Sequence, residues 1–150
     1  MKNSEIITKL FRSIVFAILL LAAPKIMAQY NNPGGSYTGS WKDLNNNEGK
    51  ISLKIYPVYQ DTYQGHAIVT QNDNTHTSLL NLSGSQGYVQ GYMSSSVYND
   101  TTNLSVFNCQ LTFSGKLGFE NDKAIIKGEA VPQGCHQHNL IYLDLVRQQE

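Results

Sequence analysis

Apolar and polar residues alternate along most of the chain after residue 36, with the period of two that is typical of β-strands. The clearest case is the segment 51–56, where Ile51, Leu53 and Ile55 alternate with Ser52, Lys54 and Tyr56. No segment beyond the N-terminal region repeats apolar residues at the spacing of an amphipathic helix. We therefore expect strands in eight segments: 37–41, 51–56, 63–70, 77–82, 87–93, 104–114, 124–131 and 140–147.

Short clusters of Asn, Asp, Gly and Ser separate these segments and predict turns. They lie at 45–49, 72–74, 83–85, 99–100 and 120–122. The connections leave no room for crossover helices, so we expect an all-β, antiparallel, up-and-down fold of about eight strands. Such a sheet has two open edges, and closing it into a barrel removes both. An eight-stranded barrel is either filled by its own side chains or holds one small ligand.

The last expected strand carries apolar residues on both faces. Ile141, Leu143 and Leu145 alternate with Tyr142 and Val146, so each face of this strand is largely apolar. One face would point into the barrel, and we expect a partner subunit to cover the other. The sequence therefore predicts a homo-oligomer.

The N-terminus has the three parts of a secretory signal peptide. Basic residues precede an apolar run at 14–23, and Ala28 supplies a small residue for cleavage. This run is too short to span a bilayer, which takes about 20 residues. We expect residues 1–28 to be removed and the protein to be exported, either to a periplasm or out of the cell. We further expect a flexible lead-in over 29–36 and a barrel domain over 37–150.

Charge changes the picture once the signal peptide is set aside. The whole chain has 11 basic and 11 acidic residues, but the part after Ala28 has 7 and 10, a net charge of −3. A nucleic-acid-binding protein needs a basic surface for the phosphates, so this class is excluded. No later segment is long and apolar enough for a membrane anchor, so we expect no membrane insertion of the mature chain.

Cys109 and Cys135 are the only two cysteines. Export would place both in an oxidising compartment, where an intramolecular disulfide is the expected state. The alternative is that one of them is a catalytic thiol, although neither lies in a known nucleophile motif.

Gly39, Ser40 and Trp41 lie on the first expected strand, and Arg147 lies at the end of the last. This pattern resembles the calycin barrels, the lipocalin and avidin type, in which Gly-x-Trp opens the first strand. The resemblance implies that Arg147 packs over the Trp41 indole, a cation–π contact worth about 0.5–2 kcal/mol. Trp41 is the only tryptophan, so the tryptophan-lined biotin site of avidin does not carry over. The alternative is that Trp41 is simply a core residue.

Tyrosine is the most frequent aromatic residue, with nine copies. Its apolar ring and polar hydroxyl suit ligands that have both characters. Tyr88 and Tyr92 are four residues apart on one expected strand and therefore share a face. We take Trp41, Tyr63, Tyr88 and Tyr92 as candidate ligand-binding residues. The alternative is that these tyrosines only pack against neighbouring strands.

His136 and His138 are the strongest candidates for metal ligands. Two residues apart on a strand, their imidazoles would point the same way and could bind one Zn²⁺ or Cu²⁺. A metal site needs further ligands, and His66, His76 and Asp144 are the candidates. The alternative is that residues 134–139 form a polar turn with two solvated histidines.

Enzyme motifs are absent: the chain has no Gly-x-Ser-x-Gly, no His-Glu-x-x-His and no phosphate loop. We therefore expect no enzyme and no cofactor. Three functions remain open. The first is an exported barrel that binds a small or amphipathic ligand in its mouth. The second is a secreted interaction protein, an inhibitor or effector acting on a host or competitor, that uses an exposed face of a filled barrel. The third is a metal-binding protein.

Overall fold

The computed structural model describes Arg12 and residues 32–71, 74–95, 109–133 and 140–149. The chain divides into two units, Met1–Tyr30 and Asn31–Glu150, and the second contains every described strand. The expected signal peptide lies outside the described residues apart from Arg12, so export stays a prediction. Within the described ranges, no helix is long and apolar enough to cross a membrane.

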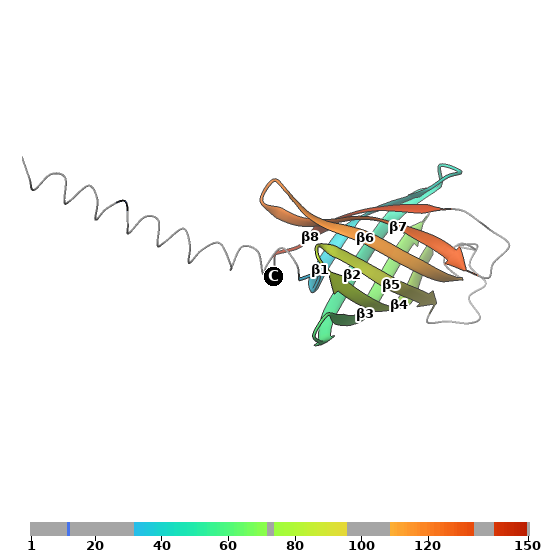
Figure 1. Cartoon of the computed structure of the whole chain (residues 1–150). Coiled ribbons are helices and arrows are strands. Elements are labelled where there is room, and N and C mark those ends of the chain that lie inside the picture. The colour runs from blue at the N-terminus through green and yellow to red at the C-terminus, as the bar shows by residue number, and fades with distance from the viewer. Residues whose placement is uncertain (1–11, 13–31, 72–73, 96–108, 134–139, 150) are drawn as a thin grey trace, which may run out of the picture. The chain divides into compact units, whose positions relative to one another are not determined.

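The second unit contains a closed barrel of eight antiparallel strands (Figure 1). Each strand pairs with the next, and seven register pairs from Tyr37↔Arg147 to Asp43↔Ile141 join the first strand to the last. The all-β, up-and-down barrel is thereby confirmed. The strands are β1 (Gly35–Asp43), β2 (Glu48–Tyr59), β3 (Thr62–Gln71), β4 (Asn74–Ser85), β5 (Tyr88–Ser95), β6 (Gln110–Glu120), β7 (Lys123–Gln133) and β8 (Ile141–Arg147).

The largest difference from the expected strands is at β6. The sequence predicted a strand over 104–114, whereas β6 continues to Glu120. Leu111, Phe113 and Leu117 all face the interior, so the alternation runs through Gly115 without a break. Glycine has no side chain and so cannot show which face of the strand it occupies. The alternation of apolar and polar residues could therefore be followed only to residue 114, before the strand ended.

Two strand connections are two-residue turns with left-handed backbone. Gln86 and Gly87 join β4 to β5, and Asn121 and Asp122 join β6 to β7, all four at positive φ. This conformation matches the twist of paired strands. The turn predicted at 120–122 is confirmed. The turn predicted at 83–85 is displaced, because β4 remains paired with β5 through Ser85.

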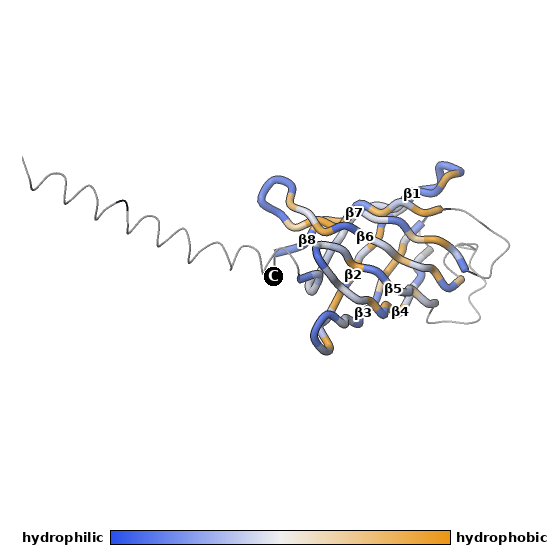
Figure 2. The backbone as a smooth tube through the Cα atoms, in the orientation of Figure 1, coloured by the Kyte–Doolittle hydropathy of each residue, from blue (hydrophilic) through white to orange (hydrophobic). Residues whose placement is uncertain are grey.

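The interior of the barrel is filled by apolar side chains. Alternate residues of each strand point inward, and hydrophobic and hydrophilic positions alternate along the tube in Figure 2. Twenty buried hydrophobic residues, drawn from all eight strands, form one cluster. Trp41, Tyr37 and Phe113 are among its largest fully buried members. A ligand inside the barrel would have to displace these side chains, which favours binding on the outer surface instead.

Five inward-facing glycines mark places where neighbouring strands approach closely. A Cβ at any of them would overlap a backbone carbonyl oxygen of a neighbouring strand. Such glycines let a closed sheet bend sharply. They are Gly39, Gly49, Gly65, Gly91 and Gly128.

The part of the lead-in that the structure describes is packed against the barrel. Pro33 and Gly34 are buried, and β1 begins at Gly35, two residues before the expected strand. The Pro33 ring and the Tyr63 ring both border the space above Gly84. Within the expected lead-in, Pro33 and Gly34 therefore pack against the barrel, while residues 29–31 lie outside the described residues.

Candidate functional site

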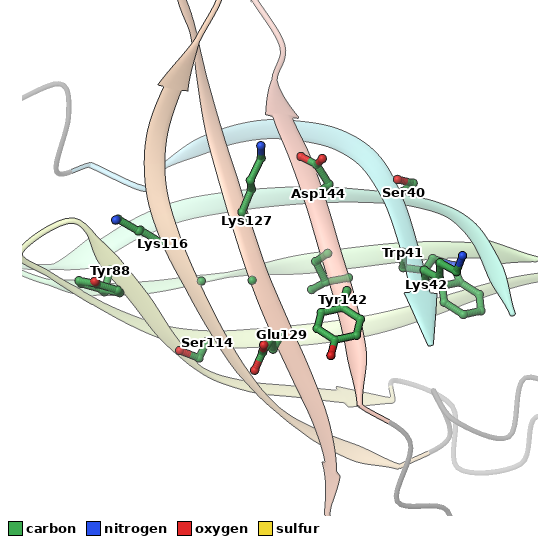
Figure 3. A pocket seen from close by; sticks show the side chains of 13 residues that line it. Ser40, Trp41, Lys42, Tyr88, Ser114, Lys116, Lys127, Glu129, Tyr142 and Asp144 are labelled. Carbon is green, nitrogen blue, oxygen red and sulfur yellow. The ribbon is translucent and has the colours of Figure 1, made fainter. Parts of the chain in front are cut away.

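A hollow of about 590 Å³ lies on the outer wall of the barrel, across β5, β6, β7, β8 and β1 (Figure 3). We call it the outer trough. Its sides are outward-pointing, exposed side chains, and its floor includes residues whose Cβ positions face inward, such as Trp41 and Leu143. The twist of a barrel gives its wall a hyperboloid shape, so that the waist is concave along the strands. The exposed lining residues are Ser40, Lys42, Tyr88, Ser114, Lys116, Lys127, Glu129, Tyr142 and Asp144.

The register of the strands aligns these side chains in two adjoining rows. Each row crosses the strands, and the rows are two residues, or about 7 Å, apart along each strand. The first row is Tyr88, Lys116, Lys127, Asp144 and Ser40. The second row is Ser114, Glu129, Tyr142 and Lys42.

The charges in the first row are unevenly matched. Lys127 forms an ion pair with Glu120, and this hydrogen bond is the main reason that the pKa of Lys127 is raised. Lys116 lies directly opposite Lys127, a like-charge arrangement that is unfavourable between neighbouring strands. Within the described strands, Lys116 has no ion-pair partner. It is therefore a cation in the trough that an anionic ligand group could neutralise.

The four candidate ligand-binding residues fall in different places. Tyr88 lines the outer trough with its ring 53% exposed, and Trp41 contributes to the floor. Tyr92 shares the outward face of β5 with Tyr88, as expected, but does not line the trough. Tyr63 is 6% exposed and belongs to the core. Tyr88 and Trp41 thus border the same hollow from its two sides, with three strands between them, whereas Tyr63 and Tyr92 do not border it.

Sequence reasoning did not find the rest of the trough. Tyr142 and Asp144 lie on β8 and Lys116 lies on β6, and only the register of the closed barrel places all three around one hollow. The alternation did place Tyr142 and Asp144 on one face of the last strand. That signal was available, but no local pattern linked it to β5 and β6.

The contact between Trp41 and Arg147 implied by the calycin resemblance is corrected by the structure. Trp41 lies opposite Leu143 on β8, whereas Arg147 lies opposite Tyr37 at the other end of β1. The Arg147 guanidinium lies against the Gly35 backbone, six residues from Trp41 along the strand. The Trp41 indole instead packs over Gly49 of β2, where a Cβ would lie 2.6 Å from its Nε1. The register of β1 with β8 is the physical reason.

Only some of the predicted metal ligands lie among the described residues. His136 and His138 lie outside the described residues. His76 is buried inside the barrel on β4, whereas His66 and Asp144 point outward from β3 and β8. Side chains on opposite sides of the barrel wall cannot bind the same metal ion. The residues that the structure describes contain no group of three or more potential metal ligands.

The disulfide and the oligomer stay predictions. Cys109 is buried immediately before β6, and the described part of the chain contains no free cysteine. Its expected partner, Cys135, lies outside the described residues. On β8, Ile141, Leu143 and Leu145 face inward, while Tyr142 is 45% exposed on the outside, which is the face expected to meet a second subunit.

Comparison with known proteins supports the fold. No protein-family model matches the chain, and no curated protein matches it. Among solved structures, a redesigned β-barrel is similar, with a TM-score of 0.54 and 10% sequence identity over 78% of this chain and 91% of that chain. An identity this low carries no information on ligands. The chain is thus a closed eight-stranded β-barrel, and a redesigned β-barrel of known structure has a similar fold.

Proposed function

We propose that this protein is an exported, non-enzymatic β-barrel that binds a small amphipathic ligand in the outer trough. The observation that supports the proposal is the trough itself, a hollow lined by two exposed tyrosines and by Lys116, which has no ion-pair partner among the described residues. The sequence suggested the mouth of the barrel as the binding place. The filled interior favours the outer wall instead.

The lining indicates the chemistry of the ligand. The Tyr88 and Tyr142 rings offer apolar faces with polar edges, which suit a flat aromatic or aliphatic body. Lys116 offers a positive charge beside Tyr88, because the two are direct cross-strand partners. We therefore expect a ligand with an apolar body and one anionic group.

The calycin resemblance supports the same class of function. Gly39 and Trp41 on β1 and the closed eight-stranded barrel fit it, although Arg147 does not pack on Trp41. We infer from it a binding protein rather than an enzyme, and we do not carry over a ligand.

A fluorescence titration with 8-anilinonaphthalene-1-sulfonate tests the proposal, because this dye is a flat apolar anion. We expect Tyr88→Ser and Lys116→Gln each to weaken binding about three- to tenfold. Tyr92→Ser is the matched control for the tyrosine, since it has the same strand, face and exposure but lies outside the trough. Lys50→Gln is the control for the lysine. Equal binding by Tyr88→Ser and Tyr92→Ser would refute the proposal.

A second candidate is the interaction protein that uses its exposed surface. It is favoured by four consecutive exposed residues at the end of β2, Tyr56 to Tyr59, with Val58 57% and Tyr59 70% exposed. Such runs of exposed apolar residues are unusual unless they bind something. Labelled protein binding to target cells would test this function. The double variant Val58→Ser, Tyr59→Ser should lose that binding while Tyr88→Ser keeps it, and the reverse result would exclude this candidate.

A further inference from the structure

A second hollow, of about 280 Å³, lies where β1 begins and where β2 and β8 end. We call it the end cleft. None of its lining residues lines the outer trough. Two cations, an aromatic ring, a proline and a pair of glycines border it. They are Lys54, Arg147, Tyr56, Pro57, Gly34 and Gly35.

The guanidinium of Arg147 lies against the backbone of Gly35. A Cβ on Gly35 would lie 2.6 Å from Nε and 2.9 Å from Nη2 of Arg147, so only glycine leaves room for the side chain in this position. Gly35 also has a φ of 130°, which disfavours other residues. The positive φ favours glycine at this position, and the absence of a side chain leaves room for the Arg147 guanidinium where it now lies.

The two cations of the end cleft, Lys54 and Arg147, have no counter-charge among the residues that the structure describes. Within the described part of the chain, Arg147 and Lys54 take part in no ion pair, and no hydrogen bond of the guanidinium is found. A guanidinium has five N–H donors, and Arg147 is half-buried, so its donors are partly withdrawn from water. No described residue takes up these donors, so they are available to a ligand.

The neighbouring groups make the cleft more than a charged surface. The Lys54 ammonium lies over the Tyr56 ring, 5.6 Å from its centroid, and the His66 ring lies 6.4 Å from the same ring. Lys54 and His66 are register partners on one side of Tyr56, so together they brace the ring. Tyr56 and Pro57 then provide an apolar wall beside the two positive charges.

We propose that the end cleft binds a small organic anion. Arg147 would hold its carboxylate or phosphate group through two parallel N–H···O hydrogen bonds, the geometry that a guanidinium prefers. Lys54 would supply the second charge, and Tyr56 and Pro57 would contact the apolar part. This site is separate from the outer trough and does not depend on the function proposed for it.

Nuclear magnetic resonance titration tests the proposal, with the amide signals of Gly34 and Gly35 and the Arg147 Nε–H signal as readouts. The probes are benzoate, phenyl phosphate and inorganic phosphate, at constant ionic strength so that general screening does not change. We expect benzoate, phenyl phosphate or both to shift these signals with saturation. The comparison of the two distinguishes a carboxylate site from a phosphate site. Inorganic phosphate should bind more weakly, because it lacks the ring. If neither organic probe shifts the three signals, the proposal fails.

Variants separate a specific site from general attraction. Lys54→Gln should weaken binding about two- to fivefold, whereas Lys50→Gln, on the same face of β2 four residues away, should not change it. Arg147→Lys keeps the charge but loses the paired hydrogen bonds and should weaken binding about tenfold or more. Lys54 is exposed, so its variant should fold even if a change at Arg147 disturbs the barrel. Equal effects of Lys54→Gln and Lys50→Gln would overturn the proposal. The titration of Tyr88→Ser with 8-anilinonaphthalene-1-sulfonate tests the outer trough alone, so its outcome leaves the proposal for the end cleft unchanged.

Discussion

The buried hydroxyl of Tyr37 has a measurable cost to the stability of the barrel. Tyr37 is 1% exposed, and its hydroxyl oxygen has no hydrogen-bond partner within the described residues. Burying an unsatisfied polar group costs about 1–3 kcal/mol. Tyr37→Phe removes this group and keeps the ring in place. We therefore expect the free energy of unfolding to increase by about 1 kcal/mol.

Chemical denaturation at pH 7 measures this change directly, and thermal unfolding should give a melting temperature about 3–5 °C higher. Tyr92→Phe is the matched control. The Tyr92 ring is half-exposed on β5, so water can satisfy its hydroxyl. Its removal should change the free energy of unfolding by less than about 0.5 kcal/mol.

Tyr37→Phe should also alter how the free energy of unfolding depends on pH in the alkaline range. Burial is the main reason that the pKa of Tyr37 is raised; the charge of Arg147 lowers this pKa and that of Tyr63 raises it. The folded protein therefore holds this proton to higher pH than the unfolded chain, whose tyrosines have a pKa near 10.0. The contribution of the protonated Tyr37 hydroxyl to stability is fully present below pH 10 and is lost as the pH rises toward the pKa of Tyr37 in the folded protein. Tyr37→Phe lacks this loss, so its advantage over the natural chain should grow above pH 10.

Two results would refute this reasoning. If Tyr37→Phe lowers the free energy of unfolding by about 1 kcal/mol, the hydroxyl has a partner, such as a bound water, that stabilises it. If the difference between the variant and the natural chain is the same at pH 8 and pH 11, Tyr37 ionises equally easily in the folded and unfolded states. Either outcome would mean that this end of the interior is wetter than the packing indicates.

Three further predictions concern the wall and the ends of the chain. Gly65→Ala should lower the free energy of unfolding, measured by chemical denaturation, by about 1–3 kcal/mol, because the new methyl group would overlap a carbonyl oxygen of β2. In the control Gly118→Ala the methyl group would meet only the flexible Ile125 side chain, so the free energy of unfolding should change by less than about 1 kcal/mol. Peptide mass spectrometry without reduction should find Cys109 joined to Cys135, and reduction should destabilise the barrel by about 3–4 kcal/mol; unlinked peptides would exclude the disulfide. Metal analysis of the purified protein should find Zn²⁺ or Cu²⁺ if His136 and His138 bind metal, and His138→Ala should lose it; metal-free protein would exclude that hypothesis.

Much of the fold could be predicted from the sequence because the strands alternate so regularly. Ile51, Leu53 and Ile55 predicted one inward face of β2, and all three are buried. The turn at 120–122 was marked by residues that tolerate left-handed backbone. The end of β6 was missed, since Gly115 and Gly118 interrupt the apolar pattern without interrupting the strand.

The candidate site could be predicted only in part. Alternation placed Tyr88 and Tyr92 on one face of β5 but could not say whether that face was inside or outside. It could not place Tyr88 and Asp144 in one row across the wall, because the two are related through three successive strand pairs. The resemblance that linked Trp41 to Arg147 failed for the same reason, since it carried no register.

The sequence by itself determined the strands, their number and their antiparallel order, because a side-chain period of two and short turns are local properties of the chain. Only the tertiary structure decided which face points inward, which residues become neighbours across β1 and β8, and where hollows form. These depend on the shear of the closed sheet, and a shift of one residue in any strand pair would exchange its inner and outer faces. The outer trough and the end cleft are therefore products of register.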